Sequence, residues 1–193
     1  INFTAAGAIT VLGPAVADDT IGRRAWGFVL AAETFGMVLG GLIALRLRVN
    51  RLLRLGVVCM FAEIPIMVGL AEAPRAVILL PAAVVAGIAI EQFAIAWEST
   101  MQHYIPTEKL ARVYSFDAVG SFIAIPLGQV AAGPAALAWG AEPTLLAGAL
   151  ITLLAVAGML LSRDVRTLPS GPSPEPERAE SPTRELDKIS GGQ

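Results

Sequence analysis

The feature that most constrains this chain is a succession of apolar stretches, each about as long as a lipid bilayer is thick, separated by short charged links. A membrane-spanning helix needs about 20 mostly apolar residues, and about 17 is the lower limit. Backbone groups in hydrocarbon must bond within their own segment, so such stretches are expected to be helices. The predicted segments are 1–17, 25–45, 55–71, 76 to about 97, one that begins near 113, and 143–162. We therefore predict an all-α membrane protein with six transmembrane helices within residues 1–166.

Composition supports this class and excludes several others. Of the residues, 55% are hydrophobic and 16% are charged, whereas soluble domains carry about a quarter charged residues. No basic face of the kind that binds nucleic acid is visible. The single cysteine, Cys59, excludes an internal disulfide, and no Cys/His spacing indicates a metal site. Neither Gly-x-Ser-x-Gly nor His-Glu-x-x-His occurs. We predict no enzyme, cofactor or metal.

The distribution of basic residues predicts an orientation. Lys and Arg are enriched in cytoplasmic links. One side carries Arg46, Arg48, Arg51, Arg54, Lys109, Arg112, Arg163 and Arg166, and the other carries Arg23, Arg24 and Arg75. We therefore expect the C-terminus to be cytoplasmic. Residues 167–193 are rich in Pro, Ser and Glu and poor in large apolar residues, so we predict a disordered tail. The chain starts at Ile1 inside an apolar segment, and we expect an N-terminal part to be missing.

Acidic residues inside the apolar segments are the candidate functional groups. A charge at mid-bilayer costs at least about 2.5–3.5 kcal/mol on insertion scales, so it faces protein or water. Such a carboxyl group suits binding and release of protons or contact with a cationic substrate, and the alternative is a structural carboxyl bonded to a neighbouring helix. We assign the substrate or proton pathway to Glu33, Glu91 and Gln92. For Glu63 the structural interpretation is preferred.

The link between the fourth and fifth segments carries a second group of charges. Arg112 is placed where it can pair with Glu98 or Asp117 when the link folds back. One interpretation is a gate that locks the cytoplasmic end in one state, and the other is a static ion pair. Beyond this link, Gly133-Pro134 and Trp139-Gly140 predict that the fifth helix ends and a loop follows.

Small residues predict close helix packing. Gly36 and Gly40 form a Gly-x-x-x-Gly pair, and Gly120, Ala124 and Gly128 repeat at every fourth position. Residues of this size let helix backbones approach closely in membranes. The pattern fits ordinary packing as well as a seam between moving helices.

Several short motifs, taken in order, resemble one family. The motifs are Gly40-Gly41, Trp97-Glu98, Gln102, Pro106, Arg112-Val113, Ser115-Phe116-Asp117, Gly120-Ser121 and Pro126-Leu127-Gly128. With six segments and matching link lengths, the chain resembles the C-terminal half, helices seven to twelve, of a major facilitator superfamily transporter. The resemblance is to bacterial exporters of the macrolide-efflux and enterobactin-exporter type. It covers residues 1 to about 166.

The resemblance implies a fold and a function. It implies two inverted three-helix repeats, with the first two helices of each repeat lining a cavity and the third packing outside. This favours Glu33 and Glu91 over Glu63 as cavity acids. It further implies proton-coupled efflux of small amphipathic molecules across the bacterial inner membrane by alternating access, with a missing six-helix half as partner. The competing hypothesis is a six-helix scaffold or assembly subunit that moves nothing.

Overall fold

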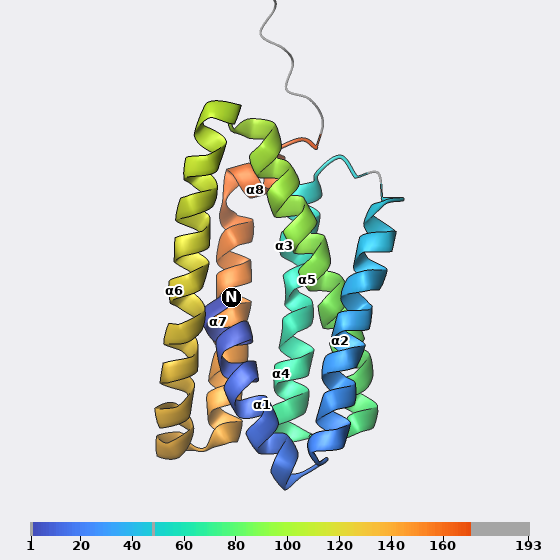
Figure 1. Cartoon of the computed structure of the whole chain (residues 1–193), viewed down its shortest axis with the longest axis vertical. Coiled ribbons are helices and arrows are strands. Elements are labelled where there is room, and N and C mark those ends of the chain that lie inside the picture. The colour runs from blue at the N-terminus through green and yellow to red at the C-terminus, as the bar shows by residue number, and fades with distance from the viewer. Residues whose placement is uncertain (1, 48, 171–193) are drawn as a thin grey trace, which may run out of the picture.

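The computed structural model describes residues 2–47 and 49–170, and every regular element within these ranges is a helix (Figure 1). The elements are η1, a π-helical turn (Asn2–Ala6), α1 (Gly7–Asp19), α2 (Arg23–Ala44), α3 (Leu52–Cys59), η2, a 3₁₀ turn (Met60–Ala62), α4 (Glu63–Glu72), α5 (Ala76–Tyr104), α6 (Thr107–Trp139), α7 (Ala141–Leu161) and α8 (Arg163–Thr167). The predicted all-helical class is confirmed.

Five helices in the described ranges are long and apolar enough to cross a membrane. Four of them are α2, α5, α6 and α7, and the other is the run Leu52–Glu72, which we call the broken helix because η2 separates α3 from α4. The first predicted segment, 1–17, is helical from Asn2 onward, but its α-helical part, α1, has only 13 residues. This part alone is shorter than the span of a bilayer. The five longer helices support a multi-pass membrane protein.

The link between α5 and α6 is much shorter than the sequence predicts. Both helices extend through the polar stretch, and only Ile105 and Pro106 lie between them. Ile105 is extended, as expected for a residue that precedes proline, which disfavours the helical conformation there. At the other end, Pro134 lies inside α6, and the predicted break at Gly133-Pro134 is wrong. Neighbouring groups in membrane proteins compensate the bond that a proline removes. The helix ends at Trp139, about one and a half turns later, and the next residue, Gly140, has a φ of 97°, which suits glycine.

The α2–α5 interface is the most extensive contact between helices. The two backbones approach so closely at Gly36 that a Cβ there would overlap the Val84 carbonyl. Gly87 has the same relation to the Glu33 carbonyl, and a Cβ on Gly40 would lie 2.9 Å from the Cβ of Glu91. We call this interface the α2–α5 seam. Small residues on both helices make it possible.

The other predicted glycine repeat is used only in part. A Cβ on Gly128 of α6 would overlap the Phe3 carbonyl, so α6 and η1 are in close contact there. Gly120 departs from the expectation, because it is exposed and a Cβ there would meet nothing within 4 Å. Its place on α6 turns it away from η1 and α1, the elements that α6 contacts most.

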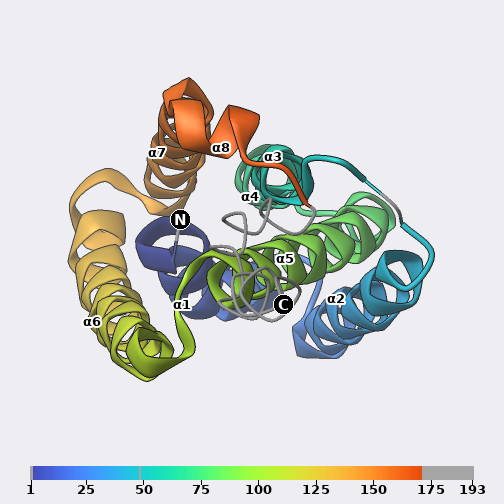
Figure 2. The ribbon, with the colours of Figure 1, turned by 90° about the horizontal axis from the view of Figure 1, so that it is seen from above.

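The core lies between α1, α2, α4, α5 and α7. It contains fully buried apolar side chains, of which the largest are Ile66, Met67, Leu70, Leu79 and Leu145. Seen from above, α1 and α5 lie between α6 and α2 (Figure 2). Large apolar side chains also project outward, among them Phe28 and Phe35 of α2 and Phe116 and Phe122 of α6. Such an exterior suits hydrocarbon surroundings.

The arginine-rich links share one end of the bundle. The α2–α3 link, the α5–α6 link and α8 all lie there, and the links near Gly22, Pro74 and Gly140 lie at the other (Figure 1). At the first end the Ser170 N–H donates to the Asn50 carbonyl at 2.9 Å. The predicted tail begins at residue 167, so its first four residues are helical or packed on this end, and 171–193 lie outside the described residues.

Candidate functional site

A cavity of about 1160 Å³ lies inside the bundle. All the membrane-length helices contribute to its wall, together with η1 and α1. Its described lining comprises Asn2, Phe3, Ile9, Thr10, Pro14, Trp26, Leu30, Glu33, Met60, Glu63, Ile66, Ala86, Ile90, Phe93, Ala94, Trp97, Glu98, Met101, Tyr114, Asp117, Ala118, Ser121, Ala124, Ala155 and Met159. Cavities that hold small molecules are commonly about 300–1,000 Å³. The volume therefore suits an organic molecule of moderate size.

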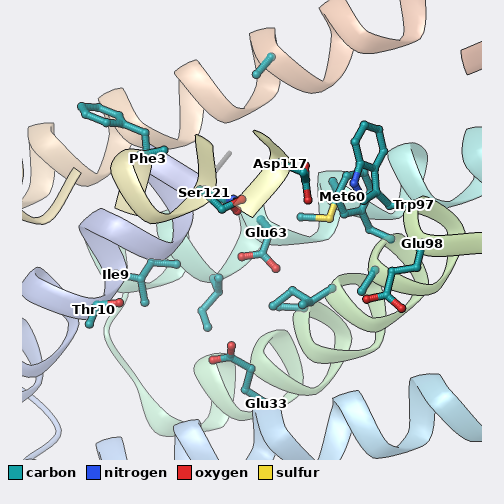
Figure 3. A pocket seen from close by; sticks show the side chains of 18 of the residues that line it. Phe3, Ile9, Thr10, Glu33, Met60, Glu63, Trp97, Glu98, Asp117 and Ser121 are labelled. Carbon is teal, nitrogen blue, oxygen red and sulfur yellow. The ribbon is translucent and has the colours of Figure 1, made fainter. Parts of the chain in front are cut away.

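Four carboxyl groups line this cavity, and no lysine, arginine or histidine is among its described lining residues. Glu33 comes from α2, Glu63 from the start of α4, Glu98 from α5 and Asp117 from α6 (Figure 3). Glu63 is the most enclosed of them, with 4% of its surface exposed. The charged groups of the described lining are thus all acidic, and most of the wall around them is apolar.

Aromatic rings lie at the same end of the cavity as Glu98. The rings of Phe93 and Trp97, one turn apart on α5, are stacked with centroids 6.2 Å apart and an interplanar angle of 18°. Tyr114 faces the cavity from α6. Trp97 lines the cavity as well. An indole face beside a carboxyl group attracts organic cations.

Glu91 and Gln92, both predicted to belong to the pathway, are not among the described residues that line the cavity. Glu91 lies against Gly40 and Gly41 of α2. Gln92 is buried in the α2–α5 seam, where its Nε2 donates to the Gly40 carbonyl at 2.6 Å. The stagger of the two helices explains this placement, because the level of Glu91 still lies beside α2. Glu98, two turns further along α5, lies beyond Ala44, the end of α2.

The predicted gating cluster is divided. Glu98 and Asp117 both line the cavity, but Arg112 is exposed and does not line it. Within the described ranges no salt bridge joins Arg112 to either acid. Arg112 lies near the start of α6, which is helical from Thr107, so the folded-back link that would bring Arg112 to Glu98 does not form.

Glu63 is the cavity residue that the sequence did not favour. The family resemblance predicted that the third segment packs outside, yet the broken helix contributes Met60, Glu63 and Ile66 to the wall. The last segment contributes Ala155 and Met159 as well. The available signal was Pro65 near a lone acid, which marks a helix irregularity beside a charge.

An ion pair spans the α1–α2 link, from Asp18 near the end of α1 to Arg23 at the start of α2. Arg23 donates to both oxygens of Asp18 at 2.7–3.0 Å. These hydrogen bonds, with the positive charge of Arg23, lower the pKa of Asp18. Opposite charge so close favours the ionised carboxylate.

The arrangement can therefore enclose an apolar molecule, neutralise a positive charge and hold protons. Among family models, curated proteins and solved structures, none matches this chain.

Proposed function

We propose that this chain is the substrate-binding half of a proton-coupled secondary transporter that exports small amphipathic molecules by alternating access. The observation that carries the proposal is the 1160 Å³ cavity with four acids and no basic residue in its described lining. A static scaffold has no use for unpaired acids inside its membrane helices, since each one disfavours insertion. A transporter needs them to bind cations and protons.

The pattern of helix contacts supports an inverted repeat. In an inverted repeat, a two-fold axis would exchange η1–α1 with α5, α2 with α6, and the broken helix with α7. The contact between α2 and α5 then corresponds to the contact between α6 and η1–α1, and both are major interfaces. The contact between α4 and α7 corresponds to itself. Inverted repeats with a site near the bilayer midplane characterise secondary transporters. The major facilitator resemblance rests on this pattern together with the sequence motifs.

The acidic lining gives the substrate a charge. An ionised carboxyl group in a weakly polar cavity attracts a cation more strongly than it would in water. We therefore propose amphipathic organic cations as the substrate class. Efflux toward the side opposite the arginine-rich links, across the inner membrane, follows from the resemblance and from the positive-inside distribution of Lys and Arg.

The binding test uses two probes that match in size and shape but not in charge. Tetraphenylphosphonium and tetraphenylborate are added to the purified chain in lipid nanodiscs, and quenching of tryptophan fluorescence reports binding, because Trp26 and Trp97 line the cavity. We expect the phosphonium to bind at least about tenfold more tightly than the borate, which corresponds to about 1.4 kcal/mol. Equal binding of the two probes contradicts the proposal, as does binding of neither.

The variant pair Glu33→Gln and Glu91→Gln locates the site. Glu33→Gln is expected to weaken phosphonium binding about tenfold, because one of the four acidic groups that line the cavity is lost. Glu91→Gln is the matched control, since Glu91 lies in a membrane helix but outside the cavity lining. In cells expressing the complete reading frame, the same contrast should appear in protonophore-sensitive dye efflux. A scaffold would show neither binding nor efflux.

A further inference from the structure

Glu63 occupies an irregular point of the bundle. The 3₁₀ turn Met60–Ala62 ends immediately before it, so the carboxyl group leaves the chain where the broken helix changes its winding. Short 3₁₀ stretches within helices often mark functional positions. Only 4% of the surface of Glu63 is exposed, and yet the residue lines the cavity.

The Glu63 carboxyl group lacks a partner. Its Oε1 atom is buried and makes no hydrogen bond to any other described residue. Buried polar atoms are nearly always hydrogen-bonded, and a buried carboxylate without a partner is costly. In Figure 3 the carboxyl groups of Glu63 and Glu33 point toward one another across the cavity, from α4 and α2. This geometry calls for a positive ligand between them.

The surroundings decide which ligand fits. The other titratable side chains in the described lining are Glu98 on α5 and Tyr114 and Asp117 on α6, all nearer the arginine-rich end of the bundle. The lining residues of η1, α1 and α7 carry no ionisable side chain. No group of three or more His, Cys, Asp or Glu among the described residues could hold a metal ion. A proton needs only two facing carboxyl groups, which then titrate as a coupled pair.

We propose that Glu63 and Glu33 together form the proton-binding site of the transporter, and that a cationic substrate entering the cavity displaces one proton from this pair. This inference rests on the proposed function. The displaced proton passes to water in the cavity, and a proton returns to the pair when the cation leaves. One positive charge replaces another, so the total charge of the two carboxyl groups and whatever they bind stays the same. Glu33 and Glu63 are therefore never both ionised without a bound cation.

The test is infrared titration of the chain in lipid nanodiscs, because the C=O stretch of a protonated carboxyl group is distinct from the bands of a carboxylate. We expect Glu63→Gln to lose one protonated-carboxyl band and to shift the titration midpoint of Glu33. Glu63→Asp keeps the carboxyl group and should restore a band. Glu142→Gln removes an exposed carboxyl group at the start of α7, outside the cavity lining, and should leave the bands of Glu33 and Glu63 unchanged. Circular dichroism and thermal unfolding establish that each variant is folded.

Proton release on addition of tetraphenylphosphonium separates this inference from the proposed function. The wild type should release about one proton for each phosphonium bound, and Glu63→Gln should bind the probe but release less than half as much. Unchanged release and an unchanged infrared titration in Glu63→Gln overturn the inference while probe binding keeps the proposed function intact. Absence of phosphonium binding in the wild type removes the proposed function and the exchange with it, and the infrared bands alone then decide whether the pair binds a proton.

Discussion

Two sides of α5 have different surroundings. On one side is the α2–α5 seam, where glycines bring backbones together and the Gln92 amide bonds to the Gly40 carbonyl. On the other side α5 and α6, although joined by only two residues, make few contacts, and the cavity lies between them and the rest of the bundle. The same helix therefore provides a rigid support and a ligand surface.

The difference shows what decides the role of an acid on this helix. Glu91 and Glu98 are seven residues apart and would share one face of a straight helix. Glu91 meets α2, and Glu98, beyond the end of α2, meets the cavity. The element that lies beside each residue therefore determines whether its carboxyl group packs against a helix or faces the cavity.

The largest effect is expected from enlarging a glycine in the seam. In Gly36→Leu the new Cβ overlaps the Val84 carbonyl, which is backbone and cannot move without shifting a helix. Overpacking of this kind costs about 3 kcal/mol. We expect the variant to unfold at markedly lower denaturant concentration in detergent, or to fail to assemble, as measured by circular dichroism and size-exclusion chromatography.

Gly120→Leu on α6 is the control for that variant. It makes the same change in a membrane-length helix, but a Cβ at Gly120 meets nothing within 4 Å. Its stability should equal or slightly exceed that of the wild type, because leucine has the higher helix propensity. Similar destabilisation of the two variants would show that the seam is no more tightly packed than the outer face of α6.

A smaller effect is expected from removing the polar bond in the seam. Gln92→Leu loses the 2.6 Å hydrogen bond to the Gly40 carbonyl but also removes a buried Oε1 without a partner. Hydrogen bonds between membrane helices contribute about 0.6 kcal/mol on average. We expect a loss of about this size in detergent unfolding, with phosphonium binding unchanged.

Gln129→Leu serves as its control, because Gln129 lies within α6 and makes no hydrogen bond to another described residue. A loss of phosphonium binding in Gln92→Leu alone would contradict the assignment of Gln92 to packing and would return it to the substrate pathway.

Much of the fold could be predicted from the sequence, because in hydrocarbon the hydropathy of a segment and its length nearly determine its secondary structure. The segments 25–45, 55–71 and 143–162 coincide with α2, the broken helix and α7 to within a few residues. The ends of α5 and α6 could not be predicted in this way. Residues 98–112 are polar but include good helix formers, and only Pro106 interrupts them. Polarity marks the end of the membrane and not the end of a helix.

The site was less predictable, because the side of a helix that faces a cavity depends on which helices pack against it. Glu33 was expected to line the cavity and does, whereas Glu91 was expected to and does not. The stagger between α2 and α5 separates Glu91 from the cavity, and nothing in the spacing of the acids encodes that stagger. Glu63 lines the cavity directly after the turn η2, and a 3₁₀ turn of three residues leaves no periodic signal in the sequence.

The smallest effect is expected at the link between α1, which belongs to the cavity wall, and α2, which belongs to the seam. The Asp18–Arg23 pair spans this link and is exposed to solvent. Because Arg23 lowers the pKa of Asp18 in the folded protein, the pair contributes stability above the ordinary pKa range of aspartate. That contribution is lost as the pH falls through the lowered value. Asp18→Asn should therefore be slightly less stable than the wild type at pH 7, equal to it in strong acid, and less different at high salt. Asp19→Asn is the control, because Asp19 is one residue away and has no ion pair to another described residue, and at pH 7 it should lose less stability than Asp18→Asn. A loss at pH 7 larger than that of Gln92→Leu would mean that the link, and not the seam, holds the cavity wall to the rest of the bundle.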